Sequence, residues 1–174
     1  MTSHRDLNSA HESAVLDSYK KNLLSSQGKV LEVIDRPDPP DAIVKIDGID
    51  TWIEITDAHF SQETAISITS YAADDKDHIP SKGGLVVDPD LVTNERVESA
   101  IRAKLQKRTM QNIATTSKPG ILLVGLYGPF FDIFEVESNF SDEFKRELKT
   151  QNIFSSIYVY QTCSENTHAY HKIR

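Results

Sequence analysis

The chain has 174 residues and a formal net charge of −7, from 19 basic and 26 acidic side chains. This length suits one globular domain, residues 1–174, and the acidic balance argues mildly against a general attraction to nucleic acid, although a local basic patch is compatible with it. A single cysteine, Cys163, excludes an internal disulfide framework and fits a reducing compartment. No secretory signal pattern is recognisable and no apolar run approaches the roughly 18 residues of a membrane span, so we expect a cytoplasmic protein without a membrane partner.

The first predicted element is a helix over residues 9–25. Its apolar side chains recur at helical spacing, and they are Val15, Leu16, Tyr19 and Leu23. Ser9 is the predicted N-cap, and Gly28 ends the element. A short apolar run at 29–34 predicts a strand. The prolines at 36–40 make that stretch an extended connector, because proline lacks an N–H and restricts the residue before it.

Residues 41–56 predict a β-hairpin around Asp47-Gly48, since this dipeptide between two alternating runs favours a two-residue type I′ turn. Such a turn determines the register, so Asp41 is expected opposite Glu54 at the end away from the turn. One face of the hairpin is predicted to enter the core, and it carries Ala42, Val44, Ile46, Ile49, Thr51, Ile53 and Ile55. The other face mixes packing and polar residues, and it carries Asp41, Ile43, Lys45, Asp50, Trp52, Glu54 and Thr56.

The middle of the chain is polar at 57–92, which predicts a large loop with a short helix at 62–72 and a strand at 84–88. A second long helix is expected at 94–110, capped by Thr93 or Asn94. Its predicted buried stripe consists of Val97, Ile101 and Leu105.

The last third begins with the apolar run 120–127, which predicts a central strand buried on both faces. Ser141 is expected to cap a helix that ends at Thr150, and 153–161 predicts another strand. The order of these elements predicts an α/β fold, with a mixed β-sheet flanked by helices. The aromatic side chains of the last strand would support a homodimer if they were exposed, and would otherwise belong to the core; they are Phe154, Tyr158 and Tyr160.

The facing carboxylates of Asp41 and Glu54 repel each other unless a positive charge compensates them. A divalent cation is the simplest compensation. Mg²⁺ prefers oxygen ligands and commonly takes one or two carboxylates plus waters, which leaves room for a phosphate, and Mn²⁺ accepts similar ligands. Such a metal activates water and stabilises the charge that develops during phosphodiester cleavage. The hairpin therefore predicts a Mg²⁺ site, with Mn²⁺ as a substitute.

The run PDPPDAIV, a short hairpin and then WIEIT resemble the PD and (D/E)XK motifs of the PD-(D/E)XK nuclease superfamily. The resemblance covers residues 12–56 and implies a restriction-endonuclease-like α-β-β-β-α-β core, with which the predicted element order agrees. It implies Asp41 as the PD aspartate and Glu54 as the second acidic metal ligand. Glu12 shares the inward stripe of the first helix and would match the glutamate that this helix often supplies. The implied activity is Mg²⁺-dependent endonuclease hydrolysis of DNA, with RNA less favoured.

The chain departs from the motif at Thr56, where the superfamily has a lysine that orients the attacking water and stabilises negative charge. Threonine supplies no positive charge, so a displaced lysine is needed. Lys45 shares a face with Asp41 but lies towards the turn, where it can pair with Asp50. Lys104, beside the buried stripe of the second long helix, can reach towards the sheet and is preferred.

Alternative interpretations of the same residues stay open. The acid pair can be a solvated strand end, and the basic stretch formed by Arg102, Lys104, Lys107 and Arg108 can be a solvated helix face rather than a phosphate contact. A catalytically inactive nuclease-like domain that binds a protein or nucleic acid is the competing function. A lysine ammonium within hydrogen-bonding reach of the acid pair would favour the enzyme, and an apolar cleft there would exclude it.

Overall fold

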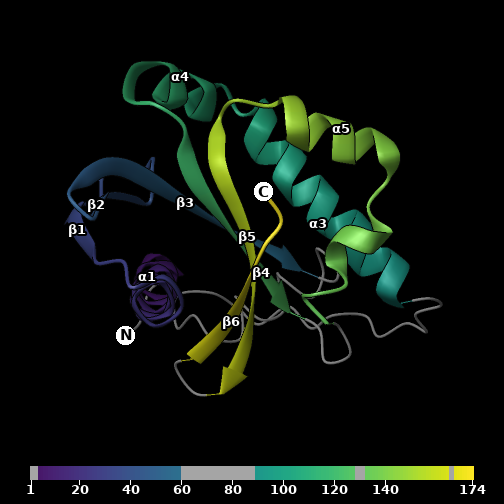
Figure 1. The fold of residues 1–174 in the computed structure, drawn as a ribbon, viewed down its shortest axis with the longest axis horizontal. Coiled ribbons are helices and arrows are strands. Elements are labelled where there is room, and N and C mark those ends of the chain that lie inside the picture. The colour runs from purple at the N-terminus through teal and green to yellow at the C-terminus, as the bar shows by residue number, and fades with distance from the viewer. Residues whose placement is uncertain (1–3, 60–88, 128–131, 165–166) are drawn as a thin grey trace.

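The computed structural model describes residues 4–59, 89–127, 132–164 and 167–174 (Figure 1). Its centre is a six-stranded mixed sheet in the order β1-β2-β3-β4-β5-β6. The strands are β1 (Leu31–Asp35), β2 (Ala42–Ile46), β3 (Ile49–His59), β4 (Gly120–Tyr127), β5 (Phe154–Ser164) and β6 (Thr167–Lys172). The first three strands form an antiparallel meander, β3, β4 and β5 run parallel, and β6 returns antiparallel to β5. The predicted mixed sheet is confirmed.

Helices cover both faces of this sheet (Figure 1). One face carries the long N-terminal helix, and the other carries the remaining helices. They are α1 (His4–Gln27), α3 (Pro89–Gln106), α4 (Arg108–Ser117), α5 (Asp142–Thr150) and the 3₁₀ helix η1 (Val136–Asn139). The α/β class with flanking helices is therefore confirmed. None of the helices within the described ranges is both long and apolar enough to cross a membrane.

The core between α1 and the sheet contains the predicted stripe of Val15, Leu16, Tyr19 and Leu23, all buried against β1 to β5. The helix is longer than its sequence pattern indicates, because it begins at His4. Ser9 therefore lies inside α1, where its carbonyl accepts the Ser13 hydroxyl at 2.7 Å. The prediction of Ser9 as N-cap is wrong, since polar residues before the apolar stripe continue the same helix.

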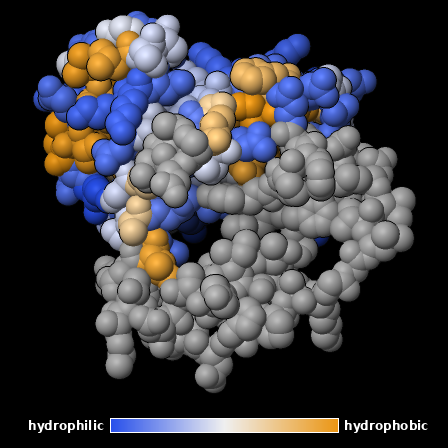
Figure 2. All heavy atoms as spheres, turned by 90° about the horizontal axis from the view of Figure 1, so that it is seen from below, coloured by the Kyte–Doolittle hydropathy of each residue, from blue (hydrophilic) through white to orange (hydrophobic). Residues whose placement is uncertain are grey.

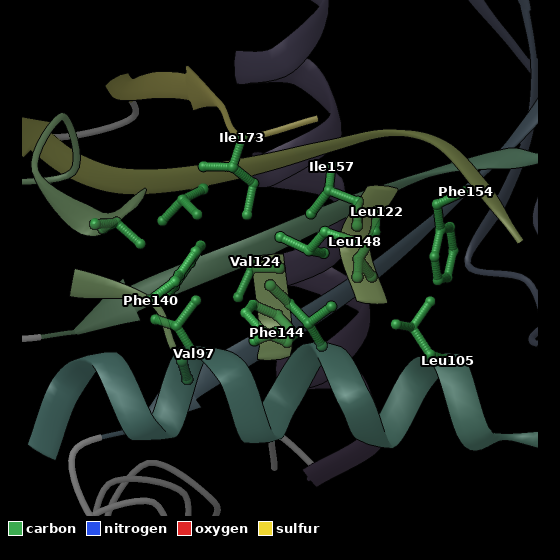
Figure 3. Close-up of a cluster of buried hydrophobic side chains, with 14 of the residues drawn as sticks. Val97, Leu105, Leu122, Val124, Phe140, Phe144, Leu148, Phe154, Ile157 and Ile173 are labelled. Carbon is green, nitrogen blue, oxygen red and sulfur yellow. The ribbon is translucent and has the colours of Figure 1, made fainter. Parts of the chain in front are cut away.

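The second core lies between the sheet and the helices α3 to α5 (Figure 3). Val97 and Leu105 of α3 point towards Leu122 and Val124 of β4, and Phe144 of α5 fills the space between them. The predicted stripe of α3 is confirmed. This core buries one face of β4 while the α1 core buries the other, as the continuous apolar run of that strand indicates.

The helix predicted over 94–110 is two helices. It begins at Pro89, so Asn94 lies within α3 as a buried side chain, and the predicted caps at Thr93 or Asn94 are wrong. Lys107 adopts an extended conformation, with φ −68° and ψ 114°, and separates α3 from α4. The change in direction brings Met110 of α4 into the core. The helical sequence pattern continues across this break, so the sequence alone predicts one helix.

The C-terminal part contains one strand, β6, that the sequence pattern does not predict. The Ser141 cap is confirmed, since its hydroxyl accepts the Phe144 amide. Phe154, Tyr158 and Tyr160 are all buried, so they belong to the core and do not form an exposed dimer surface. β3 continues to His59, whereas the predicted helix at 62–72 and strand at 84–88 lie outside the described residues.

Large exposed apolar side chains gather around β1, the edge strand of the described sheet. They include Val30, Val33, Ile34 and Ile49. Figure 2 shows hydrophobic patches among hydrophilic residues on its left, the side on which β1 and α1 lie in Figure 1.

Candidate metal and phosphate site

The hairpin of β2 and β3 brings Asp41 and Glu54 to neighbouring positions. Asp47 and Gly48 both have positive φ angles, 49° and 80°, which a type I′ turn requires. Ile46 pairs with Ile49 and Ala42 with Ile53, so the next position outward sets Asp41 beside Glu54. The predicted register is confirmed. The two-residue turn causes this register, because it prevents the two strands from shifting relative to each other.

Asp41 directly precedes β2, and its Oδ2 accepts the Ile55 amide at 2.6 Å. Burial, the largest cause, and the negative charge of Glu54 raise the pKa of Asp41 from 3.8 to about 7. Glu12 raises it further, while the Ile55 amide and the Lys104 ammonium lower it. Asp41 therefore carries a charge that its surroundings compensate incompletely.

Glu54 is almost completely buried, with 2% of its surface exposed. Its Oε1 accepts a hydrogen bond from Lys104 Nζ at 2.7 Å, and Lys107 Nζ lies 3.7 Å from the same oxygen. Its Oε2 is buried without a hydrogen-bond partner among the described residues. An ammonium group therefore reaches the acid pair from α3, and it belongs to Lys104 rather than to Lys45.

The remaining predicted residues lie near this pair in different arrangements. Lys45 lies towards the turn, where its Nζ is 3.9 Å from Asp50 Oδ1, the pairing that its position in the hairpin allows. Glu12 of α1 shares a pocket of 240 Å³ with Asp41, but its Oε2 pairs with Arg36 Nη2 at 2.9 Å. Arg36 was not predicted, because nothing in the proline-rich connector indicates that it turns back towards α1.

The acid pair fits an open divalent site better than a closed one. Within the described ranges, no group of three or more His, Cys, Asp or Glu side chains is arranged to hold a metal ion. Two carboxylates with one orphaned buried oxygen and one raised pKa nevertheless match the way Mg²⁺ binds, through one or two carboxylates with waters and substrate oxygens completing the shell. Asp41 and Glu54 are the residues that would hold it.

A second polar cluster, on the α1 face, was not predicted. His11 Nε2 lies 3.3 Å from Asp57 Oδ2, and the Tyr160 hydroxyl donates to Asp57 Oδ1 at 3.1 Å. The ring of His168 packs edge-on against Tyr160, with centroids 5.2 Å apart. The hydrogen bond to Asp57 is the main cause that raises the pKa of His11, and burial lowers that of His168. Since these residues come from α1, β3, β5 and β6, no local spacing indicates the cluster.

His168 and His171 do not form a joint metal site. They are three residues apart on β6, so their side chains lie on opposite faces of the strand. His168 contacts Tyr160, whereas His171 Nε2 is 3.5 Å from Glu137 Oε2 of η1.

The predicted basic stretch on α3 divides between two partners. Arg102 points away from the acid pair, with its Nε donating to Glu147 Oε2 of α5 at 2.8 Å. Lys104 and Lys107 instead converge on Glu54.

Comparison of the chain with protein-family models, with curated proteins and with solved structures found no match.

Proposed function

We propose that this protein is a Mg²⁺-dependent nuclease of the PD-(D/E)XK type that hydrolyses phosphodiester bonds in DNA. The observation that carries the proposal is the Lys104 ammonium, 2.7 Å from Glu54 Oε1, beside an Asp41 carboxyl of raised pKa. The same residues that match the two acidic motif positions thus acquire the missing positive charge from another element.

Each residue has a distinct role in the proposed reaction. Asp41 and Glu54 would hold the cation, which when bound supplies an activated water and stabilises charge on the phosphate. Lys104 is held by Glu54 at a defined position, where its positive charge stabilises the negative charge that develops on the phosphate oxygens. Trp52 lies on the same face of β3 as Glu54 and is buried against Phe154, with ring centroids 5.3 Å apart.

A nicking assay on supercoiled plasmid DNA, with Mg²⁺ or Mn²⁺, tests the proposal. Wild type should nick only with metal; Asp41→Asn and Glu54→Gln should abolish nicking, and Lys104→Met should slow it about 100-fold or more. Asp50→Asn is the matched control, because Asp50 lies in the same hairpin with 76% of its side chain exposed.

Metal binding is measured separately from cleavage. Trp52 is the only tryptophan and is two residues from Glu54, so it can sensitise luminescence of Tb³⁺ bound at the acid pair. We expect Mg²⁺ to displace Tb³⁺ and both acid-pair variants to bind it weakly, while Lys104→Met still binds. A wild type that neither binds Tb³⁺ nor nicks DNA would refute the proposal.

A protein-binding module without catalysis is the second candidate, and the exposed apolar side chains of β1 favour it. β1 is an edge strand of the described sheet, and edge strands can pair with another chain or a second copy. Val33→Lys and Ile34→Lys should abolish self-association measured by light scattering if β1 forms a dimer. Self-association through β1 in a wild type without nicking activity would favour this candidate.

A further inference from the structure

The end of α3 brings two ammonium groups to one carboxylate oxygen. Lys104 lies in the last turn of α3, and Lys107 is the extended residue that directly follows the helix. Their Nζ atoms lie 2.7 Å and 3.7 Å from Glu54 Oε1. One buried carboxylate oxygen thus attracts two lysines, although a single ion pair would satisfy it.

The two lysines differ in their contacts with Glu54 and in their exposure to solvent. Lys104 makes the hydrogen bond to Glu54 and has only 19% of its side chain exposed. Lys107 lies beyond hydrogen-bonding distance of that oxygen and has 46% of its side chain exposed. Lys107 thus combines a largely exposed side chain with an ammonium that lies close to Glu54 without a short hydrogen bond to it.

Backbone hydrogen bonds on both sides hold the main chain of Lys107 in place. The Lys107 amide donates to the Lys104 carbonyl at 3.3 Å, and the Lys107 carbonyl accepts the amides of Met110 and Gln111 at 2.9 and 3.2 Å. Lys107 thus joins α3 to α4 at a position held from both sides. Arg102, by contrast, pairs with Glu147 and Glu98 and is directed away from Glu54.

We infer that Lys107 is a substrate-binding residue that contacts a backbone phosphate of DNA beside the Asp41–Glu54 pair. This inference rests on the proposed nuclease function. A lysine ammonium is a compact charge that binds phosphate oxygens, and each such contact releases counterions from DNA. Lys104 remains with Glu54, and Lys107 exchanges its long contact with Glu54 for the phosphate.

The position of Lys107 gives its removal two effects of opposite sign. Loss of the ammonium removes a phosphate contact and weakens DNA binding. The same ammonium, 3.7 Å from Glu54 Oε1, repels a cation held by that carboxylate, so its loss tightens metal binding. A lysine that only supported the fold would not shift the two affinities in opposite directions.

The test compares Lys107→Met and Lys107→Arg with Lys20→Met, which removes an exposed lysine of α1 on the opposite face of the sheet. Fluorescence anisotropy with a labelled DNA duplex in EDTA measures binding without hydrolysis. We expect Lys107→Met to bind roughly eightfold more weakly at 0.1 M salt and to reduce the salt slope by about 1. Tb³⁺ titration should show roughly three- to tenfold tighter binding. Lys107→Arg should retain both wild-type affinities.

The outcomes separate this inference from the function on which it rests. If wild type nicks DNA while Lys107→Met binds DNA as well as wild type, or no more weakly than Lys20→Met, the inference is wrong and the nuclease stands. Unchanged or weaker Tb³⁺ binding by Lys107→Met also overturns it, as does a wild type that binds no DNA. If wild type binds DNA but does not nick it, and Lys107→Met shows both shifts, the phosphate contact stands and hydrolysis does not.

Discussion

Replacing Asp41 with asparagine removes a charge from the site while keeping the shape of the side chain. The amide oxygen of asparagine can still accept the Ile55 amide, which lies 2.6 Å from Asp41 Oδ2. The carboxyl differs from the amide mainly in its ionisation. Burial and the charge of Glu54 raise the pKa of Asp41 from 3.8 to about 7, so the ionised form is unfavourable in the folded protein.

The sign of the effect on stability follows from the order of the two pKa values. Below pH 3.8 the carboxyl is protonated in both the folded and the unfolded chain. Between pH 3.8 and about 7 the unfolded chain releases the proton while the folded chain retains it, so the free energy of unfolding falls by about 1.4 kcal/mol per pH unit. Above that range the loss levels off at about 4 kcal/mol.

Asp41→Asn should therefore be more stable than wild type at pH 8 by about 2 to 4 kcal/mol; the lower figure allows for solvent screening at a partly exposed carboxyl. At pH 4 the two proteins should agree within about 1 kcal/mol. Urea unfolding followed by the fluorescence of buried Trp52 measures both. With a slope of about 2 kcal/mol/M, the urea midpoint at pH 8 should rise by about 1 to 2 M.

Asp50→Asn controls for a general effect of removing negative charge, since Asp50 is exposed and its contact with Lys45 is long. Its midpoint should match wild type at both pH values. Equal midpoints of Asp41→Asn and wild type at pH 8, or a less stable variant, would refute the reasoning, because Asp41 would then be compensated by its surroundings.

Three further substitutions test other contacts. Lys104→Met leaves Glu54, which is 2% exposed, without its hydrogen-bonded cation. It should lower the free energy of unfolding at pH 7 by about 2 to 4 kcal/mol in urea titration. Lys104→Arg should retain most of the wild-type stability. Gly125→Ala places a methyl group that overlaps Asp57 Oδ1 and the Tyr160 hydroxyl, and should cost about 1 to 3 kcal/mol by calorimetry; an unchanged melting temperature would contradict the packing of that cluster. Gly48→Ala, at φ 80°, should cost about 1 kcal/mol in the same measurement without changing metal binding.

The hairpin could be predicted closely because its information is local. Asp47-Gly48 determines the turn, the turn determines the register, and the register sets Asp41 beside Glu54. Lys104 could be ranked above Lys45 for a similar reason, since its place beside the buried Ile101–Leu105 stripe orients it towards the sheet. In both cases the residues of one short segment determine the predicted feature.

The parts that could not be predicted depend on contacts between distant segments. The His11–Asp57 pair joins α1 to the end of β3, and nothing near either residue indicates the other. The break at Lys107 has no proline or glycine to mark it, because the burial of Met110 rather than a local propensity favours the turn. β6 pairs with β5 as the last strand of the sheet, and its polar residues THAYHK resemble a loop.

The three acids around the proposed metal differ in how far neighbouring positive charges and donors compensate their negative charge. This difference predicts which acid contacts the metal first. Glu12 has Arg36 and Glu54 has Lys104 and Lys107, whereas among the described residues Asp41 has only the Ile55 amide as its direct hydrogen-bond donor. A cation entering the site therefore gains most from Asp41, whose pKa of about 7 leaves it partly protonated at neutral pH. Because a metal binds the deprotonated carboxylate, binding near pH 7 must release a fraction of a proton, and the apparent affinity must rise between pH 6 and 8. Such a rise would place Asp41 in the first contact with the metal, since Glu54 already has a cation of its own.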